Sequence, residues 1–334
     1  MISLLLEKKR RQAQKTVLGV EFDTASLAAV KLKKTHDSYS LLSCDSDIFP
    51  PEAYFEDQLT SDYVGGVISN IVTNNKLGYF TKLGFTSYND IDVIKEELIC
   101  DKKGLEIIEK QGVLFYIVEH FLKKKFPETY AQIAFDYEDD VNNKGLLTVY
   151  YISDIDKVNQ LRNIASKAKK SLSVCTLDKI IITSFVNDLF LSEISNNSGD
   201  IVLLGLYADK LSICSFSPKG DFRNYEVIKI FDTKMSDVSY IDEVIQLLLR
   251  FMDFMSLDIS GNDFDYFDEA NNAKVYVYGL KQNFESIFES IRDLSQKQCE
   301  VLNPFININH DNFGEIEQPY RYVVPVAIAM REAL

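Results

Sequence analysis

The chain has 334 residues, a hydrophobic share of 46% and a formal net charge of −14. This length and composition are typical of a globular protein with two ordinary domains. The negative charge argues against nucleic acid as a partner, because binding to phosphate backbones needs concentrated Lys and Arg. The longest apolar runs are shorter than the roughly 20 residues of a membrane-spanning helix, so we expect a chain that does not cross a bilayer.

The segment 1–16 places an apolar patch before its basic residues, Lys8, Lys9, Arg10, Arg11 and Lys15. A signal peptide has the reverse order, so we expect a cytoplasmic protein. The basic tract has two interpretations. It rests on anionic lipid headgroups, at about 1 kcal/mol per basic residue near the surface, or it is a solvated tail.

The five cysteines are widely separated in the sequence, at Cys44, Cys100, Cys175, Cys214 and Cys299. A zinc site usually has ligands two to four residues apart, so this spacing favours neither a metal site nor a disulfide framework.

A strand, a tight polar turn and a second strand are predicted over Val17–Phe22, Asp23–Ser26 and Leu27–Leu32. Hydrophobic periodicity and turn residues predict the elements that follow. They are a strand over Tyr39–Ser46, a helix from Ser61 or Asp62 to Asn74, a strand over Lys82–Thr86, helices near Ile91–Cys100 and over Gln111–Phe126, strands over Ala131–Tyr137 and Leu146–Ser153, a helix over about Ile155–Lys170, and a strand around Ser173–Thr176.

The second half of the sequence repeats this order. After a helix over Leu177–Ser195, it has strands over Asp200–Tyr207, Leu211–Ser217 and about Asn224–Ile230, a helix over Ile241–Leu257, a strand over Val275–Tyr278, and helices over Phe284–Leu294 and Val323–Ala333. We therefore predict a basic tail over 1–16, a first half over 17–176 with a subdomain inserted at about 87–170, and a second half over 177–334.

Five stretches carry a resemblance to a known family: LGVEFDTASLAAV at 18–30, the strand-helix-strand-helix segment 147–180, EVIQLLLRFMDFM at 243–255, LNPFININ at 302–309 and VVPVAIAMREAL at 323–334. Together they resemble the PilM family of type IV pilus assembly proteins, relatives of the cell-division protein FtsA. The resemblance implies an α/β fold of the actin-like ATPase type, built from two duplicated halves that are each similar to ribonuclease H.

In that superfamily the turn of the first hairpin presents backbone N–H groups and hydroxyls to the phosphates of a nucleotide. A carboxylate at the end of the first strand holds a hydrated metal ion, and a glycine lets the backbone approach. The resemblance puts the carboxylate at Glu21, the glycine at Asp23 and the hydroxyls at Thr24 and Ser26. A carboxylate at Asp23 would repel a polyphosphate at close range.

The other nucleotide motifs are also altered. The resemblance aligns Gly205 with the second phosphate turn, which puts Leu203 where a carboxylate is expected, and Gly279 with the adenosine slot, where Tyr278 would crowd the base. We therefore predict a degenerate nucleotide site with no catalytic residue, no metal and no cofactor; ATP and Mg²⁺ are the alternative if the site still functions.

In the PilM family a groove between the first subdomain and the inserted unit holds the N-terminal cytoplasmic tail of a membrane protein, PilN. Such a groove takes an extended peptide along a strand edge, here expected from Ala131–Tyr137 or Leu146–Ser153. An acidic rim at Asp136, Glu138, Asp139 and Asp140 would suit a basic juxtamembrane tail. The alternative is a solvated hairpin with no partner.

The leading hypothesis is thus a non-catalytic cytoplasmic scaffold, peripheral at the inner membrane, in the assembly platform of a type IV pilus or a related type II secretion system. The resemblance also implies contact with cytoplasmic motor parts, such as a motor ATPase. The first alternative is an ATP-binding relative with weak ATPase activity. The second is a sugar or acetate kinase of the superfamily, which would need catalytic aspartates and glycine-rich loops that we do not find.

Overall fold

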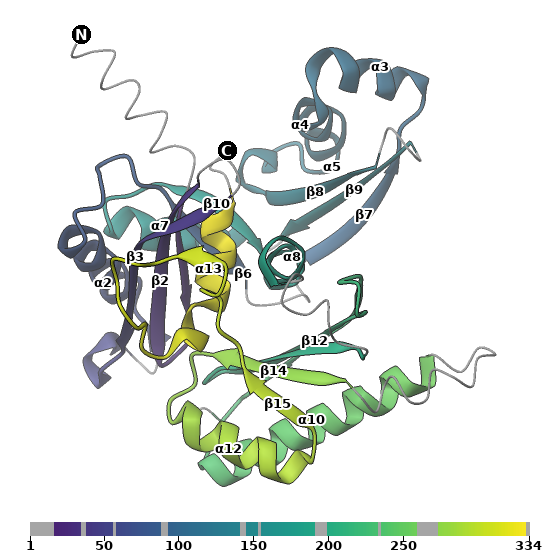
Figure 1. The fold of residues 1–334 in the computed structure, drawn as a ribbon. Coiled ribbons are helices and arrows are strands. Elements are labelled where there is room, and N and C mark those ends of the chain that lie inside the picture. Colours follow the sequence, from purple (N-terminus) through teal and green to yellow (C-terminus); the bar gives the residue numbers. More distant parts are fainter. Residues whose placement is uncertain are drawn as a thin grey trace.

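A computed structural model describes residues 17–34, 38–55, 58–87, 93–140, 145–152, 155–190, 199–232, 235–258 and 273–331. These residues form two large sheets, helices around and between the sheets, and a lobe with a third sheet (Figure 1). No helix in this part of the chain is long and apolar enough to cross a membrane.

The first large sheet has the strand order β10-β6-β1-β2-β3-β16. Its strands are β1 (Leu18–Phe22), β2 (Ser26–Lys34), β3 (Tyr39–Ile48), β6 (Leu83–Ser87), β10 (Leu172–Leu177) and β16 (Ile308–Asn309). Strands β1, β2 and β3 form an antiparallel meander, and β6 and β10 extend it in parallel on the β1 side.

The second large sheet has the order β13-β12-β11-β14-β15. Its strands are β11 (Ile201–Leu206), β12 (Lys210–Phe216), β13 (Phe222–Lys229), β14 (Lys274–Gly279) and β15 (Gln298–Val301). An antiparallel meander is again extended by two parallel strands. The order matches β3-β2-β1-β6-β10 strand for strand, so the two sheets have the duplicated topology that the sequence predicts.

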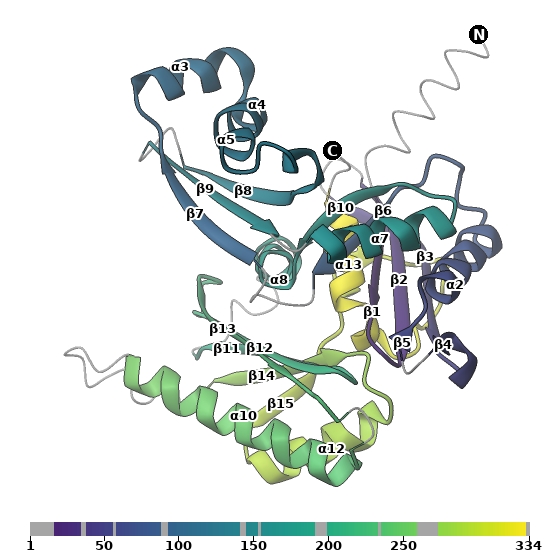
Figure 2. The ribbon, with the colours of Figure 1, turned by 180° about the vertical axis from the view of Figure 1, so that it is seen from behind.

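Helices cover the outer faces of both sheets (Figure 2). They are α2 (Ser61–Asn74) and α7 (Ile155–Lys167) on the first sheet, and α10 (Asp237–Asp258) and α12 (Phe284–Ser295) on the second. The Thr60 side chain caps α2 by accepting a hydrogen bond from the Tyr63 N–H, at 3.3 Å. Helices α2 and α7 pack closely, because a Cβ added at Gly65 would lie only 2.4 Å from the Cβ of Lys167.

Two further helices lie between the sheets and connect them. They are α8 (Asp178–Phe185), which continues as the π-helix η5 (Val186–Phe190), and α13 (Val323–Met330). Helix α13 follows the second sheet in the chain but packs on the first, where a Cβ added at Gly19 would lie 2.1 Å from the Pro325 carbonyl oxygen. Conversely, Phe190 after the first sheet packs edge-on against Tyr276 of β14, with ring centroids 4.9 Å apart.

The separate lobe has a three-stranded antiparallel sheet in the order β7-β9-β8. Its elements are β7 (Val93–Ile99), α3 (Lys102–Gln111), α4 (Val113–Tyr116), η3 (Ile117–Leu122), α5 (Lys123–Lys125), η4 (Tyr130–Gln132), β8 (Ala134–Asp140) and β9 (Leu146–Ile152). The lobe has a core of its own, in which the Tyr151 ring contacts Phe121 and Phe126. The remaining short elements are η1 (Pro51–Ala53), β4 (Tyr54–Phe55), β5 (Gln58–Leu59) and η7 (Pro319–Tyr322).

The helix predicted near Ile91–Cys100 is wrong, because residues 93–99 form the strand β7. Strand β7 pairs along its whole length with β9, from Val93 opposite Ile152 to Ile99 opposite Leu146. This pairing between distant segments outweighs the helical preference of the Glu-Glu-Leu stretch. The helix expected over Gln111–Phe126 is present as α4, η3 and α5, and α3 precedes it.

The predicted boundaries of the halves also need correction. The inserted lobe comprises residues 93–152 rather than about 87–170, because α7 packs with α2 and β10 pairs with β6 of the first sheet. The second half does not extend to residue 334. Strand β16 pairs with β3, and α13 packs on β1 and β2, so the chain returns to the first sheet after β15.

Candidate functional site

The turns of the two matching hairpins meet between the large sheets. In the first hairpin the last strand pair is Phe22 with Leu27, and in the second it is Leu206 with Leu211. Both turns therefore have the same length. Asp23 corresponds to Tyr207, and Ser26 to Lys210.

This register corrects the predicted alignment of the second turn. Leu203 lies in the middle of β11, opposite Cys214 and four positions before Tyr207, so it is not at the position of the expected carboxylate. The residue that matches Glu21 is Gly205. The prediction was wrong because it placed Gly205 in the turn, whereas Gly205 belongs to the strand.

The carboxylate of Asp23 joins the two turns. Its Oδ1 accepts hydrogen bonds from the backbone N–H groups of Ala25 and Ser26, at 2.7 and 2.8 Å. Its Oδ2 accepts one from the N–H of Ala208 in the second turn, at 2.8 Å. Asp23 is only 2% exposed. One buried carboxylate thus holds N–H groups from both turns.

Other hydrogen bonds reinforce this contact. The Ser26 hydroxyl donates to the Leu280 carbonyl oxygen just after β14, at 3.1 Å. The Tyr240 hydroxyl, from α10, donates to the Tyr207 carbonyl oxygen at 2.9 Å. On the outer side the Tyr54 hydroxyl donates to the Thr24 carbonyl oxygen. Both turns are therefore fixed from several directions.

A buried ion pair lies next to the two turns. Lys210, in the second turn, pairs with Asp178 at the start of α8, and both side chains are almost completely buried. The Lys210 ammonium also lies 4.5 Å from the centre of the Tyr207 ring. Burial acts to lower the pKa of Lys210, but the attraction of Asp178 and Glu21 outweighs it and raises that pKa. Lys210 therefore stays charged.

Glu21 is buried in the same cluster and is hydrogen-bonded to the Tyr207 side chain. Burial raises the pKa of Glu21 to about 8, against the attraction of Lys210. Burial likewise raises the pKa of Asp23, while its three N–H partners oppose the shift. Within the described part of the chain, no group of His, Cys, Asp and Glu side chains is arranged to hold a metal ion. A carboxyl group that is neutral at pH 7 is a poor metal ligand.

The two predicted glycines lie close to these turns but face protein groups. A Cβ added at Gly205 would lie 2.3 Å from the Ser212 hydroxyl and about 3 Å from the rings of Tyr207 and Tyr278. Gly279 has a φ of +129°, and a Cβ there would lie 2.1 Å from the Leu206 carbonyl oxygen. The space that these glycines leave open is filled by tyrosine rings and by backbone.

The structure thus brings together the six residues predicted for a vestigial nucleotide site: Glu21, Asp23, Thr24, Ser26, Gly205 and Gly279. In this structure the Asp23 carboxylate accepts the turn N–H groups, and the Tyr278 ring is buried against Tyr207. Sequence reasoning missed Asp178, Lys210, Tyr207 and Tyr240. The only local signal was the lysine that ends the second turn.

The predicted acidic rim lies on β8, which contains Asp136, Glu138, Asp139 and Asp140. Strand β8 is at one edge of its sheet and pairs with β9. The alternative edge, Leu146–Ser153, is excluded over its described residues, because β9 lies between β7 and β8. Strand β8 is therefore the edge that remains for a peptide in the predicted groove.

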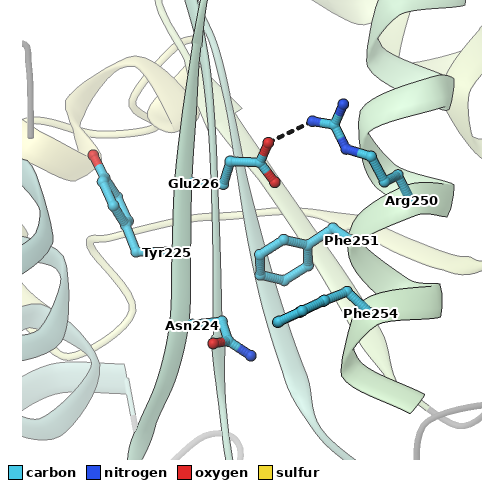
Figure 3. Close-up of a pocket in the computed structure, with 6 residues that line it drawn as sticks. All are labelled: Asn224, Tyr225, Glu226, Arg250, Phe251 and Phe254. Atoms are coloured by element: carbon cyan, nitrogen blue, oxygen red, sulfur yellow. Dashed lines mark hydrogen bonds and ion pairs between the residues drawn. The ribbon is translucent and has the colours of Figure 1, made fainter. Parts of the chain in front are cut away.

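A pocket of about 240 Å³ lies elsewhere, between β13 and α10 (Figure 3). Its lining residues are Asn224, Tyr225 and Glu226 from the strand and Arg250, Phe251 and Phe254 from the helix. Arg250 pairs with Glu226 across it. None of the residues of the two turns lines it, and no sequence motif pointed to it.

The duplicated sheets, the two facing turns and the helices exchanged between the halves define an actin-like α/β fold. The solved structure of a PilM–PilN type IV pilus biogenesis complex is similar over 95% of this chain and 98% of that chain, with a TM-score of 0.60 and 12% identity. A protein of unknown function with an actin-like ATPase fold from Bacteroides thetaiotaomicron is similar over 88% of this chain and 93% of that one, with a TM-score of 0.42 and 10% identity. No protein-family model and no curated protein sequence matches the chain.

Proposed function

We propose that this protein is a non-catalytic actin-like scaffold of an inner-membrane assembly platform, such as that of a type IV pilus or a type II secretion system. It works in the cytoplasm, at the membrane, by binding the cytoplasmic tail of a membrane protein. The observation that carries the proposal is the Asp23 carboxylate, which accepts N–H groups from both turns. The side chain of Asp23 thus joins the two halves of the protein.

The chemistry of the turns supports the absence of catalysis. Hydrogen bonds to a charged group are each worth about 1.5–3 kcal/mol, so a phosphate would have to displace three of them. It would also meet the buried carboxyl groups of Glu21 and Asp178. In the first turn the carboxylate of Asp23 is already occupied by these N–H groups. In the second turn, burial raises the pKa of Asp209 to about 6, which weakens it as a metal ligand.

The likeness to the PilM–PilN complex supports the partner. It extends over nearly the whole of both chains, the inserted lobe included. The proposed occupant is a short basic segment of an inner-membrane protein, similar to PilN, lying along β8. Its basic side chains would face the acidic residues of that strand, and its backbone would extend the lobe's sheet. A cytoplasmic motor ATPase is a second proposed partner.

Calorimetric titration with Mg-ATP tests the non-catalytic half of the proposal. We expect no heat of binding with the wild-type chain. Sub-micromolar affinity would reject the proposal in favour of the second candidate, a nucleotide-binding protein with weak ATPase activity. One observation favours that candidate: the Thr24 hydroxyl is buried in the turn without a hydrogen-bond partner.

Titration of candidate tail peptides tests the partner. Asp139→Lys together with Asp140→Lys should weaken a basic peptide at least tenfold. Glu106→Lys with Glu109→Lys, on the exposed helix α3 of the same lobe, is the matched control and should leave the affinity unchanged. Equal affinity for both double variants would remove β8 from the proposal, and failure of every tail to bind would remove the partner.

A further inference from the structure

The strands of the first large sheet begin or end along two opposite sides, which we call its two edges here. These two edges have opposite charge. The edge that faces the second sheet carries Asp23 and Asp178, at the ends of β1 and β10. At the opposite edge β1, β3, β6 and β10 begin and β2 ends. That edge points away from the second sheet (Figure 1).

Lysines stand at this outer edge beside almost every strand. They are Lys33 and Lys34 at the end of β2, Lys76 after α2, Lys82 before β6, and Lys169 and Lys170 before β10. All are exposed or half-exposed. We call this set the basic edge. Such a concentration contrasts with a chain whose net charge is −14.

Two aromatic side chains project from the same edge. Tyr79 is 84% exposed and Phe80 is 41% exposed, and their rings pack edge to face at 5.5 Å. Lys170 fixes the loop that carries them, because its ammonium donates to the carbonyl oxygens of Gly78 and Tyr79 at 3.3 and 3.1 Å and lies 5.7 Å from the centre of the Tyr79 ring. Neighbouring exposed aromatics surrounded by lysines are typical of surfaces that enter the headgroup region of a membrane.

The described chain begins at this edge. The Leu18 N–H donates to the Lys82 carbonyl oxygen at 2.9 Å, so the sequence before Val17 joins the fold next to the aromatic loop. That sequence supplies five more basic residues within Lys8–Lys15.

We propose that the basic edge docks on an anionic bilayer surface, with Tyr79 and Phe80 at headgroup level. The inference rests on the proposed scaffold function and assigns the face that the scaffold turns to the membrane. In this orientation the second sheet, on the far side of the two turns, points into the cytoplasm. Each basic residue near an anionic surface raises the partition coefficient about fivefold, so the lysines of one face act together.

Co-sedimentation of the full chain with vesicles tests the proposal. We expect binding to vesicles of phosphatidylglycerol and phosphatidylethanolamine and none to phosphatidylcholine. Lys76→Glu with Lys169→Glu should weaken binding at least tenfold, and Tyr79→Ser with Phe80→Ser should weaken it by a factor that changes little with salt. Lys219→Glu with Lys297→Glu, an equal charge change in the second half, is the matched control and should bind like wild type.

The proposal is overturned if the wild-type chain does not sediment with anionic vesicles, if it binds a DNA duplex in preference to them, or if the basic-edge and control variants bind equally. A thermal melt of each variant shows that it is folded. The tail-peptide titration, done without lipid, separates the two proposals. If the Lys76→Glu, Lys169→Glu variant binds the peptide as tightly as wild type, a failure of the vesicle experiment rejects only the proposed membrane face. If the wild-type chain binds no peptide, the proposed partner of the scaffold is rejected.

Discussion

The β1–β2 and β11–β12 hairpins have the same topology and the same turn length but different chemistry. The first turn reads Asp-Thr-Ala-Ser and supplies an acceptor, the Asp23 carboxylate. The second reads Tyr-Ala-Asp-Lys and supplies a donor to it, the Ala208 N–H, while its Lys210 ammonium pairs with Asp178 of α8. After duplication of a backbone, two equal turns can become complementary. Here the Asp23 carboxylate of one turn accepts the Ala208 N–H of the other.

The strands before the turns show the same complementarity. Glu21 of β1 is a buried carboxyl group, whereas its counterpart Gly205 leaves a space that the rings of Tyr207 and Tyr278 fill. One side of the contact is polar and the other aromatic. The comparison therefore predicts that substitutions which break the complementarity cost more stability than similar substitutions elsewhere in the two sheets.

The largest effect is expected at Lys210. Lys210→Met leaves the Asp178 carboxyl group buried without its cation, which should lower the free energy of unfolding by about 3–5 kcal/mol. Urea denaturation measures this change. Lys274→Met is the matched control. Its ion pair with Glu300, at 2.7 Å, is half exposed on the carboxylate side, so the loss should stay below about 1 kcal/mol. Equal losses in the two variants would contradict the special role of the second turn.

Asp23→Ala should be the next most costly change. It removes the acceptor of three N–H groups in both turns, which we expect to lower the free energy of unfolding by about 3 kcal/mol. Small-angle scattering should also show a larger radius of gyration, because the two halves lose the bond to Ala208. The exposed Asp47→Ala, at the end of β3, should change neither quantity. A variant at Asp23 that remains as compact and stable as wild type would show that the carboxylate does not hold the halves.

Stability should depend on pH through Glu21. Its pKa is about 8 in the folded protein and about 4.5 when unfolded, so the folded state holds the proton more tightly between these values. The contribution is complete below pH 4.5 and is lost as pH rises towards 8, by about 2–3 kcal/mol between pH 5 and pH 7. Asp209, with a pKa raised to about 6 by burial, changes stability in the same direction. Unfolding measured across this range should show a flatter profile in Glu21→Gln, and an identical slope would contradict a buried neutral carboxyl group.

The smallest effect is expected at Ser26. Ser26→Ala loses the hydrogen bond to the Leu280 carbonyl oxygen and should lower the free energy of unfolding by about 1 kcal/mol. Ser290→Ala, on an exposed surface of α12, is a control whose bond to the Ser286 carbonyl oxygen is solvated. Thermal melts of the two variants distinguish the buried contact from the exposed one.

The sequence was sufficient wherever the determinants are local. Alternating apolar residues around Asp23–Ser26 predict the first hairpin, and an aspartate that accepts N–H bonds from the following residues is a common turn signal. The bond from Ala208 to the same carboxylate joins residues 185 positions apart, and no local pattern reveals it. The same reason explains the errors at β7, whose partner β9 is distant in the sequence, and at α13, whose packing partner is the first hairpin.

The position of α13 has a consequence for the order in which this chain can fold during synthesis. Helix α13 covers Gly19 and Gly84 of the first sheet, and it is made about 300 residues after Gly19 and about 240 residues after Gly84. Until that helix leaves the ribosome, the strands β1 and β6 have an uncovered apolar face, and contacts of such long sequence separation form late. During most of translation the first half is therefore incomplete and exposes apolar surface. In that state we expect it to depend most on chaperones.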